Sequence, residues 1–312
     1  MDDVMARKLL IAAPRGWCAG VERAVEIVER TLVRHGPPVY VRKQIVHNLH
    51  VVRGLEEKGA VFVESEDDVP EGAVCVLSAH GVSPAVHENA GRRHLQVVDA
   101  TCPLVTKVHV EAQRFAKGGR TIFLIGHNGH EEIEGTAGEA PDQVVVIGGP
   151  GDVERAVAAN PDRVAYLTQT TLAVDETVEM IKALRERFPA IVGPKHDDIC
   201  YASSNRQEAV KALAARSDLV FIVGSENSSN SNRLVEVARE VGTASYLIPD
   251  ETSIDPAWIG EAEVVGVSSG ASTPDVLVER VVAYLAERGY ADVEEVRVAT
   301  EDVHFPLPAG LD

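Results

Sequence analysis

Long apolar stretches are missing from this 312-residue sequence. No run approaches the roughly 18 consecutive apolar residues that a membrane-spanning helix needs, so we expect no contact with a membrane. The first residues, Met1–Met5, lack the basic start and the cleavage site of a secretory signal peptide. Only four cysteines occur, and they lie too far apart to indicate a disulfide framework. Together these absences predict a cytoplasmic protein.

Basic residues are also scarce. Lys and Arg number 30 against 48 Asp and Glu, which gives a formal net charge of −18. Proteins that bind nucleic acids gain most of their non-specific affinity by neutralising phosphates, so we expect no nucleic-acid partner. Aromatic residues make up only 4% of the chain, so its cores must consist mainly of Val, Ala, Leu and Ile. The length suits one large domain or two to three compact ones.

Several motifs for nucleotides and metals are absent. Neither G-x-x-x-x-G-K-[ST] nor G-x-G-x-x-G occurs, which argues against a mononucleotide or dinucleotide site. H-E-x-x-H and C-x-x-C are absent too, so the usual local spacing of zinc ligands is missing. A cluster of His127, His130, Glu131 and Glu132 still leaves a zinc hydrolase as one alternative.

Short apolar runs alternate with helical patterns along the chain. Leu9–Ala13, Thr121–Ile125 and Leu219–Val223 have the length of buried strands, and an apolar stripe marks a helix from Cys18 to about Arg34. This alternation predicts an α/β fold with mainly parallel sheets that are covered on both faces. In such folds ligands bind beyond the carboxyl ends of the strands.

Three of the four cysteines occupy the same kind of position. Cys18, Cys102 and Cys200 each open a predicted helix, and Thr101 is the predicted N-cap before Pro103. A helix N-terminus lowers the pKa of a thiol and favours the thiolate. The three cysteines are therefore either small buried hydrophobic residues or the ligands of an iron–sulfur centre with one open iron.

The spacing of these cysteines predicts three similar α/β domains. We expect domains at residues 14–101, 102–199 and 200–290, the last completed by an N-terminal strand at residues 8–13, and a C-terminal tail at residues 291–312. The polar strand ends would then share one central site. The fourth cysteine, Cys75, lies within a predicted strand and is expected to pack in the core.

Polar side chains gather at the ends of the predicted strands. His47, His80 and His130 follow strand or loop ends, and Ser228–Asn232 and Ser272 add neutral donors. Imidazolium groups and helix N-terminal amides both bind phosphate. A single such histidine is more often a surface residue, and the serine run could be only a helix cap. Together these donors predict how an acidic chain could hold a diphosphate without a lysine patch.

The motifs around these residues closely resemble those of the LytB family, the 4-hydroxy-3-methylbut-2-enyl diphosphate reductases. In chain order they are Pro14–Gly20, Val46–Asn48, Ser78–Ser83, Asp99–Pro103, Glu134–Thr136, Thr168–Thr171, Asp197–Tyr201, Ser228–Arg233 and Gly270–Ser272. As a set they are highly specific. Trp17 stands where the family usually has phenylalanine.

The resemblance implies three α/β domains around a pseudo-threefold axis with a central [4Fe-4S] cluster. Its ligands would be Cys18, Cys102 and Cys200, which leaves one iron open to substrate. The implied residues of the substrate diphosphate site are His47, His80, His130, Ser228, Ser229, Asn230 and Ser272. Thr170 would lie beside the substrate hydroxyl, and Thr171 would line the same pocket.

Glu132 matches the glutamate that delivers a proton in the family. Glu131 stands where the family usually has proline, so either carboxylate could face the cluster. Glu132 keeps the spacing to the motif Glu134–Thr136, and we therefore identify it as the acid.

The implied reaction is reductive dehydroxylation of 4-hydroxy-3-methylbut-2-enyl diphosphate to isopentenyl and dimethylallyl diphosphate, the last step of the methylerythritol phosphate route. Two electrons and two protons remove the hydroxyl group as water. The electrons must come from outside because the chain has no nucleotide motif, and our hypothesis is a partner of the ferredoxin or flavodoxin type.

Two other functions would also use three cysteines. A non-redox lyase of the quinolinate synthase kind would need arginines for its carboxylate substrate, but the strand ends carry mostly His, Ser, Thr and Asn. An iron–sulfur sensor without turnover would explain the cysteines, but it would not explain Glu132, Thr170 or the donor-rich loops.

Overall fold

The computed structural model describes residues 7–311. Every pairing between strands within these residues is parallel. Met1–Met5, to which the prediction about a signal peptide applies, lie outside the described residues. The strands form three sheets, which confirms the predicted α/β class with mainly parallel sheets. The chain divides into two units, one of residues 7–19, 47–51 and 201–304 and one of residues 20–46, 52–200 and 305–311.

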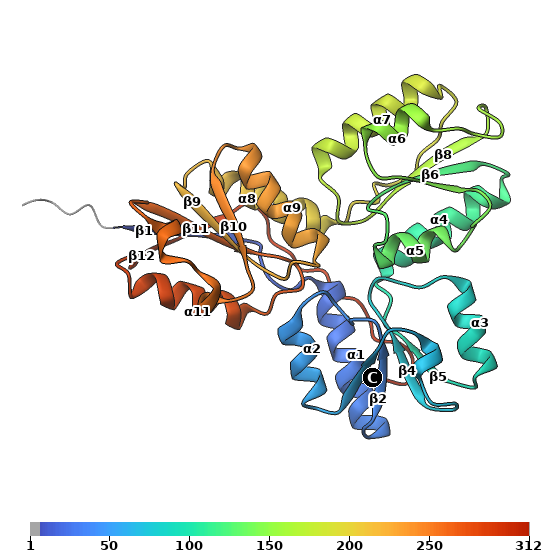
Figure 1. Cartoon of the computed structure of the whole chain (residues 1–312), viewed down its shortest axis with the longest axis horizontal. Coiled ribbons are helices and arrows are strands. Elements are labelled where there is room, and N and C mark those ends of the chain that lie inside the picture. Colours follow the sequence, from blue (N-terminus) through green and yellow to red (C-terminus); the bar gives the residue numbers. More distant parts are fainter. Residues whose placement is uncertain (1–6, 312) are drawn as a thin grey trace, which may run out of the picture. The chain divides into compact units, whose positions relative to one another are not determined.

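The first unit contains a five-stranded sheet in the order β10-β9-β11-β1-β12 (Figure 1). Its strands are β1 Lys8–Ala13, β9 Leu219–Val223, β10 Ala244–Ile248, β11 Val264–Ser269 and β12 Asp292–Arg297. Its helices are α8 Tyr201–Ala214, α9 Ser229–Glu240, α10 Pro256–Ile259 and α11 Asp275–Ala286, with a 3-10 turn, η2, at Glu251–Ser253. The N-terminal strand thus completes a sheet that is otherwise built from the last third of the chain.

Both faces of this sheet are buried. In β9, Leu219, Phe221 and Val223 pack in a core with α11, whereas Val220 and Ile222 pack in a second core with α8 and α9. Successive side chains of a strand point to opposite faces, so a strand covered on both faces is apolar at every position. Each fully buried apolar side chain of this size stabilises the fold by about 1.5–3 kcal/mol.

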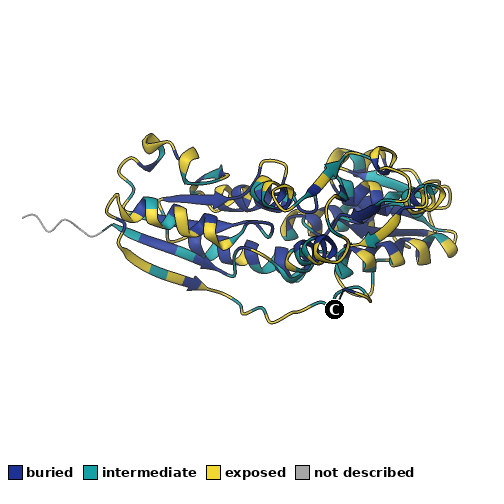
Figure 2. Cartoon of the chain, turned by 90° about the horizontal axis from the view of Figure 1, so that it is seen from below, coloured by how far each residue is buried: buried dark blue, intermediate teal, exposed yellow. Residues whose placement is uncertain are grey.

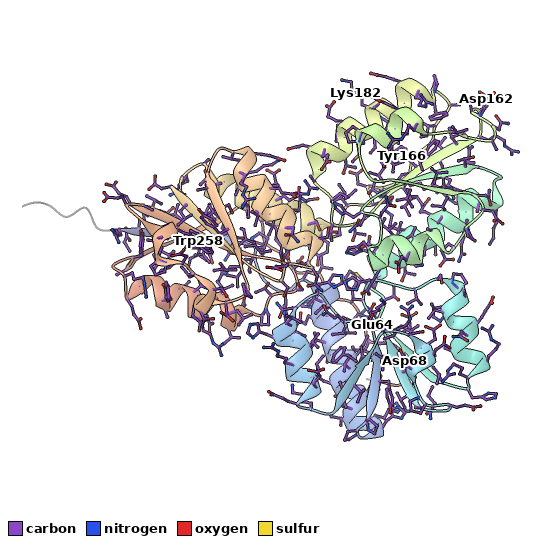
Figure 3. All side chains as sticks on the ribbon, viewed as in Figure 1. Glu64, Asp68, Asp162, Tyr166, Lys182 and Trp258 are labelled. Carbon is purple, nitrogen blue, oxygen red and sulfur yellow. The ribbon has the colours of Figure 1, made fainter. Side chains whose placement is uncertain are left out.

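Trp258 completes the first of these cores (Figure 3). Its ring stacks on Tyr246 with the two centroids 4.2 Å apart, and its centroid lies 6.5 Å from that of Phe221. Trp17, the other tryptophan of the chain, belongs to the same unit. Tryptophan fluorescence therefore reports on this unit.

The second unit contains two sheets, in the orders β3-β2-β4-β5 and β7-β6-β8. The strands are β2 Val39–Arg42, β3 Ala60–Val63, β4 Val74–Leu77, β5 Gln96–Asp99, β6 Thr121–Ile125, β7 Val144–Ile147 and β8 Val164–Thr168. The helices are α1 Ala19–His35, α2 Leu49–Glu56, α3 Pro84–Arg92, α4 Pro103–Lys117, α5 Glu131–Ala137, α6 Pro150–Arg155 and α7 Val174–Arg187, with a 3-10 turn, η1, at Glu66–Asp68. The first residue of α1 and the first three of α2, Leu49–Val51, belong to the first unit.

The central strands of the second unit are buried, and the exposed surface lies mainly on helices and turns (Figure 2). In β6, Phe123 and Ile125 pack in a core with α7, and Ile122 and Leu124 pack in another core with α4 and α5. Cys75 is fully buried in the core of the other sheet, as predicted. No helix within residues 7–311 is both long enough and apolar enough to span a membrane.

One detail differs from the sequence predictions. Cys102, rather than Thr101, is the N-cap of α4, because its backbone is extended and Pro103 already begins the helix. The predicted C-terminal tail contains β12, which pairs with β1 at the edge of the sheet. An edge strand needs only one buried side, and in β12 only Val296 is buried. The three-domain boundaries stay a prediction.

Candidate active site

Three cysteines lie directly before helices. Cys18 follows β1 and precedes α1, Cys102 follows β5 and caps α4, and Cys200 precedes α8. All three are half-buried, whereas Cys75 is fully buried within β4. Burial raises the pKa of the Cys75 thiol to about 11, so this thiol stays protonated at neutral pH. Cys75 is therefore unsuited to bind a metal as a thiolate.

The backbones of the three cysteine loops are held in the same way. Each cysteine N–H donates to the carbonyl of a residue that follows a strand: Cys18 to Ala271 after β11 (3.3 Å), Cys102 to Ala79 after β4 (3.0 Å) and Cys200 to Thr170 after β8 (3.0 Å). The carboxyl ends of the strands thus fix where each cysteine lies.

Glu132, in the first turn of α5, is almost fully buried at 3% exposure. The Thr170 N–H donates to Glu132 Oε1 (2.6 Å), and the Thr170 hydroxyl donates to Glu132 Oε2 (3.0 Å). Burial raises the pKa of Glu132 above its usual value, although the hydrogen bonds from Thr170 oppose this. The carboxyl group is therefore fixed in orientation and keeps a proton more readily than an exposed glutamate does.

Glu131 lies in a different environment. Its Oε2 accepts a hydrogen bond from Ser78 Oγ (3.4 Å) and lies 3.3 Å from His80 Nδ1. Burial by itself raises the pKa of Glu131, but the hydrogen bond and charge of His80, together with the charge of Lys43, hold it below its usual value. Glu131 is thus an ionised partner of His80 rather than a proton donor.

His130 connects these two glutamates. Its Nδ1 accepts a hydrogen bond from the Glu132 N–H (3.2 Å), and its ring stands edge-on to His80 with centroids 5.8 Å apart. Burial, reinforced by His80, lowers the pKa of His130 to about 4. The ring is therefore neutral at pH 7, and because Nδ1 accepts, the proton lies on Nε2, which can donate to a ligand.

Thr171 follows in the same loop of the second unit. Its hydroxyl accepts a hydrogen bond from Gln169 Nε2 (2.9 Å), while Gln169 Oε1 accepts one from the His127 N–H (3.0 Å). Gln169 is almost fully buried and ties the loop after β8 to the loop after β6. It therefore fixes the Thr171 side chain, one residue after the threonine that holds Glu132.

The remaining predicted residues lie in the first unit. Ser272 Oγ donates to the His47 carbonyl (3.0 Å), and His47 Nδ1 lies 3.4 Å from Asn227 Nδ2. Asn230 Oδ1 accepts from the N–H of Ala271 (2.9 Å), whose carbonyl holds the first cysteine. The polar donors of this unit are thus connected to its cysteine loop.

Ser228 and Ser229 begin α9. Ser228 is the N-cap, and its Oγ accepts from the Ser231 N–H (3.3 Å) and the Ser231 hydroxyl (3.0 Å). A Cβ on Gly270 would collide with Ser231, so the loop after β11 approaches α9 closely only because residue 270 has no side chain.

The structure thus brings the predicted site residues together in two groups. Glu132, Thr170, Thr171, His80 and His130 lie in one unit with Cys102 and Cys200, and His47, Ser228, Ser229, Asn230 and Ser272 lie in the other with Cys18. Sequence reasoning had assigned no role to Ser78, Gln169 or Asn227. Their positions could have indicated a role in the site, because each residue lies within or directly beside one of the polar strand-end motifs.

The sequence model of the LytB protein family matches residues 9–286. The chain belongs to the LytB family. It is 57% identical over its whole length to a protein of Nocardia farcinica named 4-hydroxy-3-methylbut-2-enyl diphosphate reductase, of which it covers 93%. It is 58% identical over 98% of its length to a protein of that name from Acidothermus cellulolyticus, of which it covers 90%.

A solved structure also resembles this LytB chain. The E-1-hydroxy-2-methyl-but-2-enyl-4-diphosphate reductase of Plasmodium falciparum matches with a TM-score of 0.95 and 36% identity, covering 98% of this chain and 97% of that one. The resemblance in fold therefore extends over nearly the whole molecule.

A LytB reductase implies an iron–sulfur cofactor, and the cysteines of this LytB chain fit that group. Iron–sulfur clusters take thiolate ligands. Three cysteines are half-buried in loops of matching construction before helices. The deeply buried Cys75 does not fit, because its thiol is held protonated in an apolar core.

Proposed function

We infer that this LytB chain catalyses the reductive dehydroxylation of 4-hydroxy-3-methylbut-2-enyl diphosphate, the terminal step of the methylerythritol phosphate route. Curated relatives with that name align over the full chain. The observation that carries the chemistry is the buried Glu132 carboxyl group fixed by Thr170. The substrate hydroxyl, two electrons and two protons yield water and a five-carbon diphosphate, isopentenyl or dimethylallyl diphosphate, so the site must supply protons where water is excluded.

We propose that the cofactor is a [4Fe-4S] cluster with Cys18, Cys102 and Cys200 as its ligands and one open iron. When bound, such a cluster supplies electrons and a Lewis-acidic iron for the hydroxyl group that leaves. The half-buried position and common backbone anchoring of the three cysteines support this assignment. The electrons would come from an external donor of the ferredoxin or flavodoxin type.

Glu132 is the proposed acid, and Thr170 is the group that passes its proton on. The Thr170 hydroxyl donates to Glu132 Oε2 (3.0 Å); when Oε2 carries a proton this hydrogen bond reverses, and Thr170 can then donate its own proton to the substrate hydroxyl. The raised pKa of Glu132 favours the protonated state that this step needs. Thr171 would line the pocket beside Thr170.

The diphosphate would be bound by donors from both groups of site residues. His130 offers a neutral Nε2–H, and His80 is oriented by the ionised Glu131. Ser228, Ser229 and Asn230 lie at the N-terminus of the 12-residue helix α9, where amide groups favour anions. We assign His47 and Ser272 to the same diphosphate site. The cytoplasmic location expected from the sequence stays a prediction.

Substitution of the two neighbouring glutamates tests the proposed acid. In chain reconstituted anaerobically with iron and sulfide, Glu132→Gln should lower turnover by about 10²- to 10⁴-fold, the range for loss of a general acid. The visible spectrum of the cluster should be unchanged. Glu131→Gln is the matched control and should retain proton delivery while weakening substrate binding through His80. Full activity of Glu132→Gln would refute the assignment.

Alanine substitution of each cysteine tests the ligands. Cys18→Ala, Cys102→Ala and Cys200→Ala should each lower the iron and acid-labile sulfide bound after reconstitution. Cys75→Ala is the control, because this cysteine is buried in a core. It should bind iron and sulfide as the parent chain does. Equal loss in all four variants would contradict a ligand set of three.

A further inference from the structure

Each helix that follows a site cysteine carries a basic residue at nearly the same position. Arg23 lies five residues after Cys18, Lys107 lies five residues after Cys102, and Arg206 lies six residues after Cys200. All three direct their donors to backbone carbonyls of a cysteine loop, and in no case is that loop the one that begins their own helix.

Arg23, in α1, holds the loop before Cys102. Its Nη1 donates to the carbonyls of Ala100 (3.4 Å) and Thr101 (3.1 Å), and Thr101 directly precedes the cysteine. Its Nε donates to the carbonyl of Pro306 (2.8 Å). All of its acceptors are therefore backbone groups.

Lys107, in α4, holds the segment before Cys200. Its Nζ donates to the carbonyls of His196 and Asp197, both at 2.7 Å, and to Asp198 Oδ1 at 3.3 Å. An ammonium group has three donors, and three consecutive residues accept all of them. The fully buried Asp198 side chain also accepts from the Thr168 N–H (3.1 Å), which ties this segment to the end of β8.

Arg206, in α8, holds the loop before Cys18. This fully buried arginine donates from Nε and Nη2 to the Gly16 carbonyl (3.1 and 2.7 Å) and from Nη2 to the Trp17 carbonyl (3.3 Å). Its Nη1 donates to Glu301 Oε1 (3.0 Å), which offsets the cost of burying the charge, and to the carbonyl of Ala202 in its own helix (3.0 Å). Trp17 directly precedes the cysteine.

We propose that Arg23, Lys107 and Arg206 are positioning residues that form a closed cycle, in which the helix begun by one cysteine clamps the loop of the next. The order runs from Cys18 to Cys102, from Cys102 to Cys200, and from Cys200 back to Cys18. The proposal rests on the proposed role of these cysteines as ligands. Groups outside the ligand shell commonly orient the ligands of a metal site in this way.

A cation is well suited to this position. Its hydrogen bonds to carbonyl oxygens are charge-assisted and so hold a loop more firmly than neutral donors would. The clamps therefore fix the three loops before the cluster binds and limit the access of other reagents to the cysteines.

The test measures how fast each cysteine of the full, iron-free chain is alkylated by iodoacetamide, with the sites read by peptide mass spectrometry. Arg23→Gln is the main variant because, among residues 7–311, Arg23 donates only to backbone carbonyls, so no carboxylate there loses a partner. Arg30→Gln is its matched control, since Arg30 lies two turns further along α1 and also holds a C-terminal carbonyl, that of Leu311 (2.8 Å), but holds no cysteine loop.

Two further variants test the rest of the cycle. The double variant K107M/D198N removes the ammonium group without leaving a buried charge behind. Arg206→Lys keeps a positive charge for Glu301 but loses the planar fork that holds Gly16 and Trp17. Circular dichroism of each variant establishes that it is folded.

Each variant should raise the alkylation rate of the cysteine whose loop it holds, and not that of the cysteine that begins its own helix. Arg23→Gln should raise the alkylation rate of Cys102 about tenfold while Cys18 and Cys200 stay within about twofold of the parent chain. The double variant should raise the rate at Cys200, and Arg206→Lys should raise it at Cys18. Arg30→Gln should change none of them. A rise at a variant's own helix-start cysteine, an equal rise at all four cysteines, or no rise at all would overturn the proposal.

Loading of the cluster gives a second measurement. Arg23→Gln should take up less iron and sulfide than Arg30→Gln and lose its visible absorbance faster in air. If the parent chain itself takes up no iron and sulfide, the proposed ligand role of the cysteines fails. The alkylation rates of the variants still show whether each basic residue holds the loop of another cysteine. If the parent loads fully and Arg23→Gln loads and decays identically, the clamps do not position the ligands.

Discussion

Glu131 and Glu132 are neighbours in the sequence but carry opposite shifts in pKa. Both are buried enough for desolvation to raise the pKa, and the difference lies in their partners. Glu131 faces His80 and the charge of Lys43, which together favour its ionised form. Glu132 faces Thr170, which offers hydrogen bonds but no charge. One residue is therefore an ionised partner of a histidine, and the other is suited to hold a proton.

His130 should make the stability of the chain depend on pH. Its folded-state pKa of about 4 lies below the ordinary value of 6.5, so the unfolded chain takes up the proton first as the pH falls. The free energy of unfolding should therefore be undiminished above pH 6.5 and fall by about 3 kcal/mol in total between pH 6.5 and about 4. His130→Asn, which keeps a side-chain acceptor for the N-cap, should remove this loss.

Urea unfolding of the iron-free chain at several pH values between 4 and 7 measures this effect. His35→Asn, at an exposed position, is the control and should follow the parent chain. An equal pH dependence in His130→Asn and the parent would contradict the assignment of a depressed pKa to His130.

The sequence alone could predict the donor types of the site but not how neighbouring groups interact. Spacing favoured Glu132 over Glu131, yet the environment that separates them comes from His80 and Thr170, which lie far away in the sequence. The contact between Arg23 and Thr101 is equally hidden, because 78 positions separate the two residues. Electrostatic environment depends on such distant contacts, and a single sequence does not reveal them.

At the scale of elements, continuous apolar runs proved reliable. Thr121–Ile125 and Leu219–Val223 are strands with the predicted bounds, because strands buried on both faces are apolar throughout and end in polar turns. Helix starts were less predictable, as at Thr101, because the N-cap depends on the backbone angles of one residue. β12 lies within the predicted C-terminal tail, and its pairing with β1, nearly 300 positions earlier, could not be predicted from its own short β-like pattern.

Two glycines should respond oppositely to alanine. Gly54 lies inside α2 and an added Cβ would meet nothing within 4 Å, so Gly54→Ala should stabilise the chain by about 0.5–1 kcal/mol. Gly126 follows β6, and a Cβ there would collide with Ile133 and Gln169, so Gly126→Ala should destabilise it by about 1–3 kcal/mol. Urea unfolding compares the two variants, and a stabilising Gly126→Ala would contradict the close packing.

At the scale of the molecule, the C-terminal segment belongs to a different unit from the strand before it. β12 is part of the first unit, whereas residues 305–311 belong to the second. There Arg23 donates to the Pro306 carbonyl (2.8 Å), Arg30 donates to the Leu311 carbonyl (2.8 Å), and the Leu311 side chain is buried. The segment is thus an integral part of the second unit.

Deletion of residues 305–312 should therefore destabilise the second unit. The loss of the buried Leu311 side chain alone corresponds to about 1.5–3 kcal/mol. Far-UV circular dichroism during urea unfolding measures the loss, and tryptophan fluorescence follows the first unit separately. An unchanged midpoint by circular dichroism would show that the segment contributes nothing to stability.

The most direct test of the central claim is anaerobic turnover of 4-hydroxy-3-methylbut-2-enyl diphosphate. The chain would be reconstituted with iron and sulfide, supplied with a strong one-electron reductant, and its products separated and identified. Our account predicts both isopentenyl and dimethylallyl diphosphate, with their formation lost in Glu132→Gln while the cluster spectrum persists. An intact cluster in the parent chain with no conversion of this substrate would contradict the account.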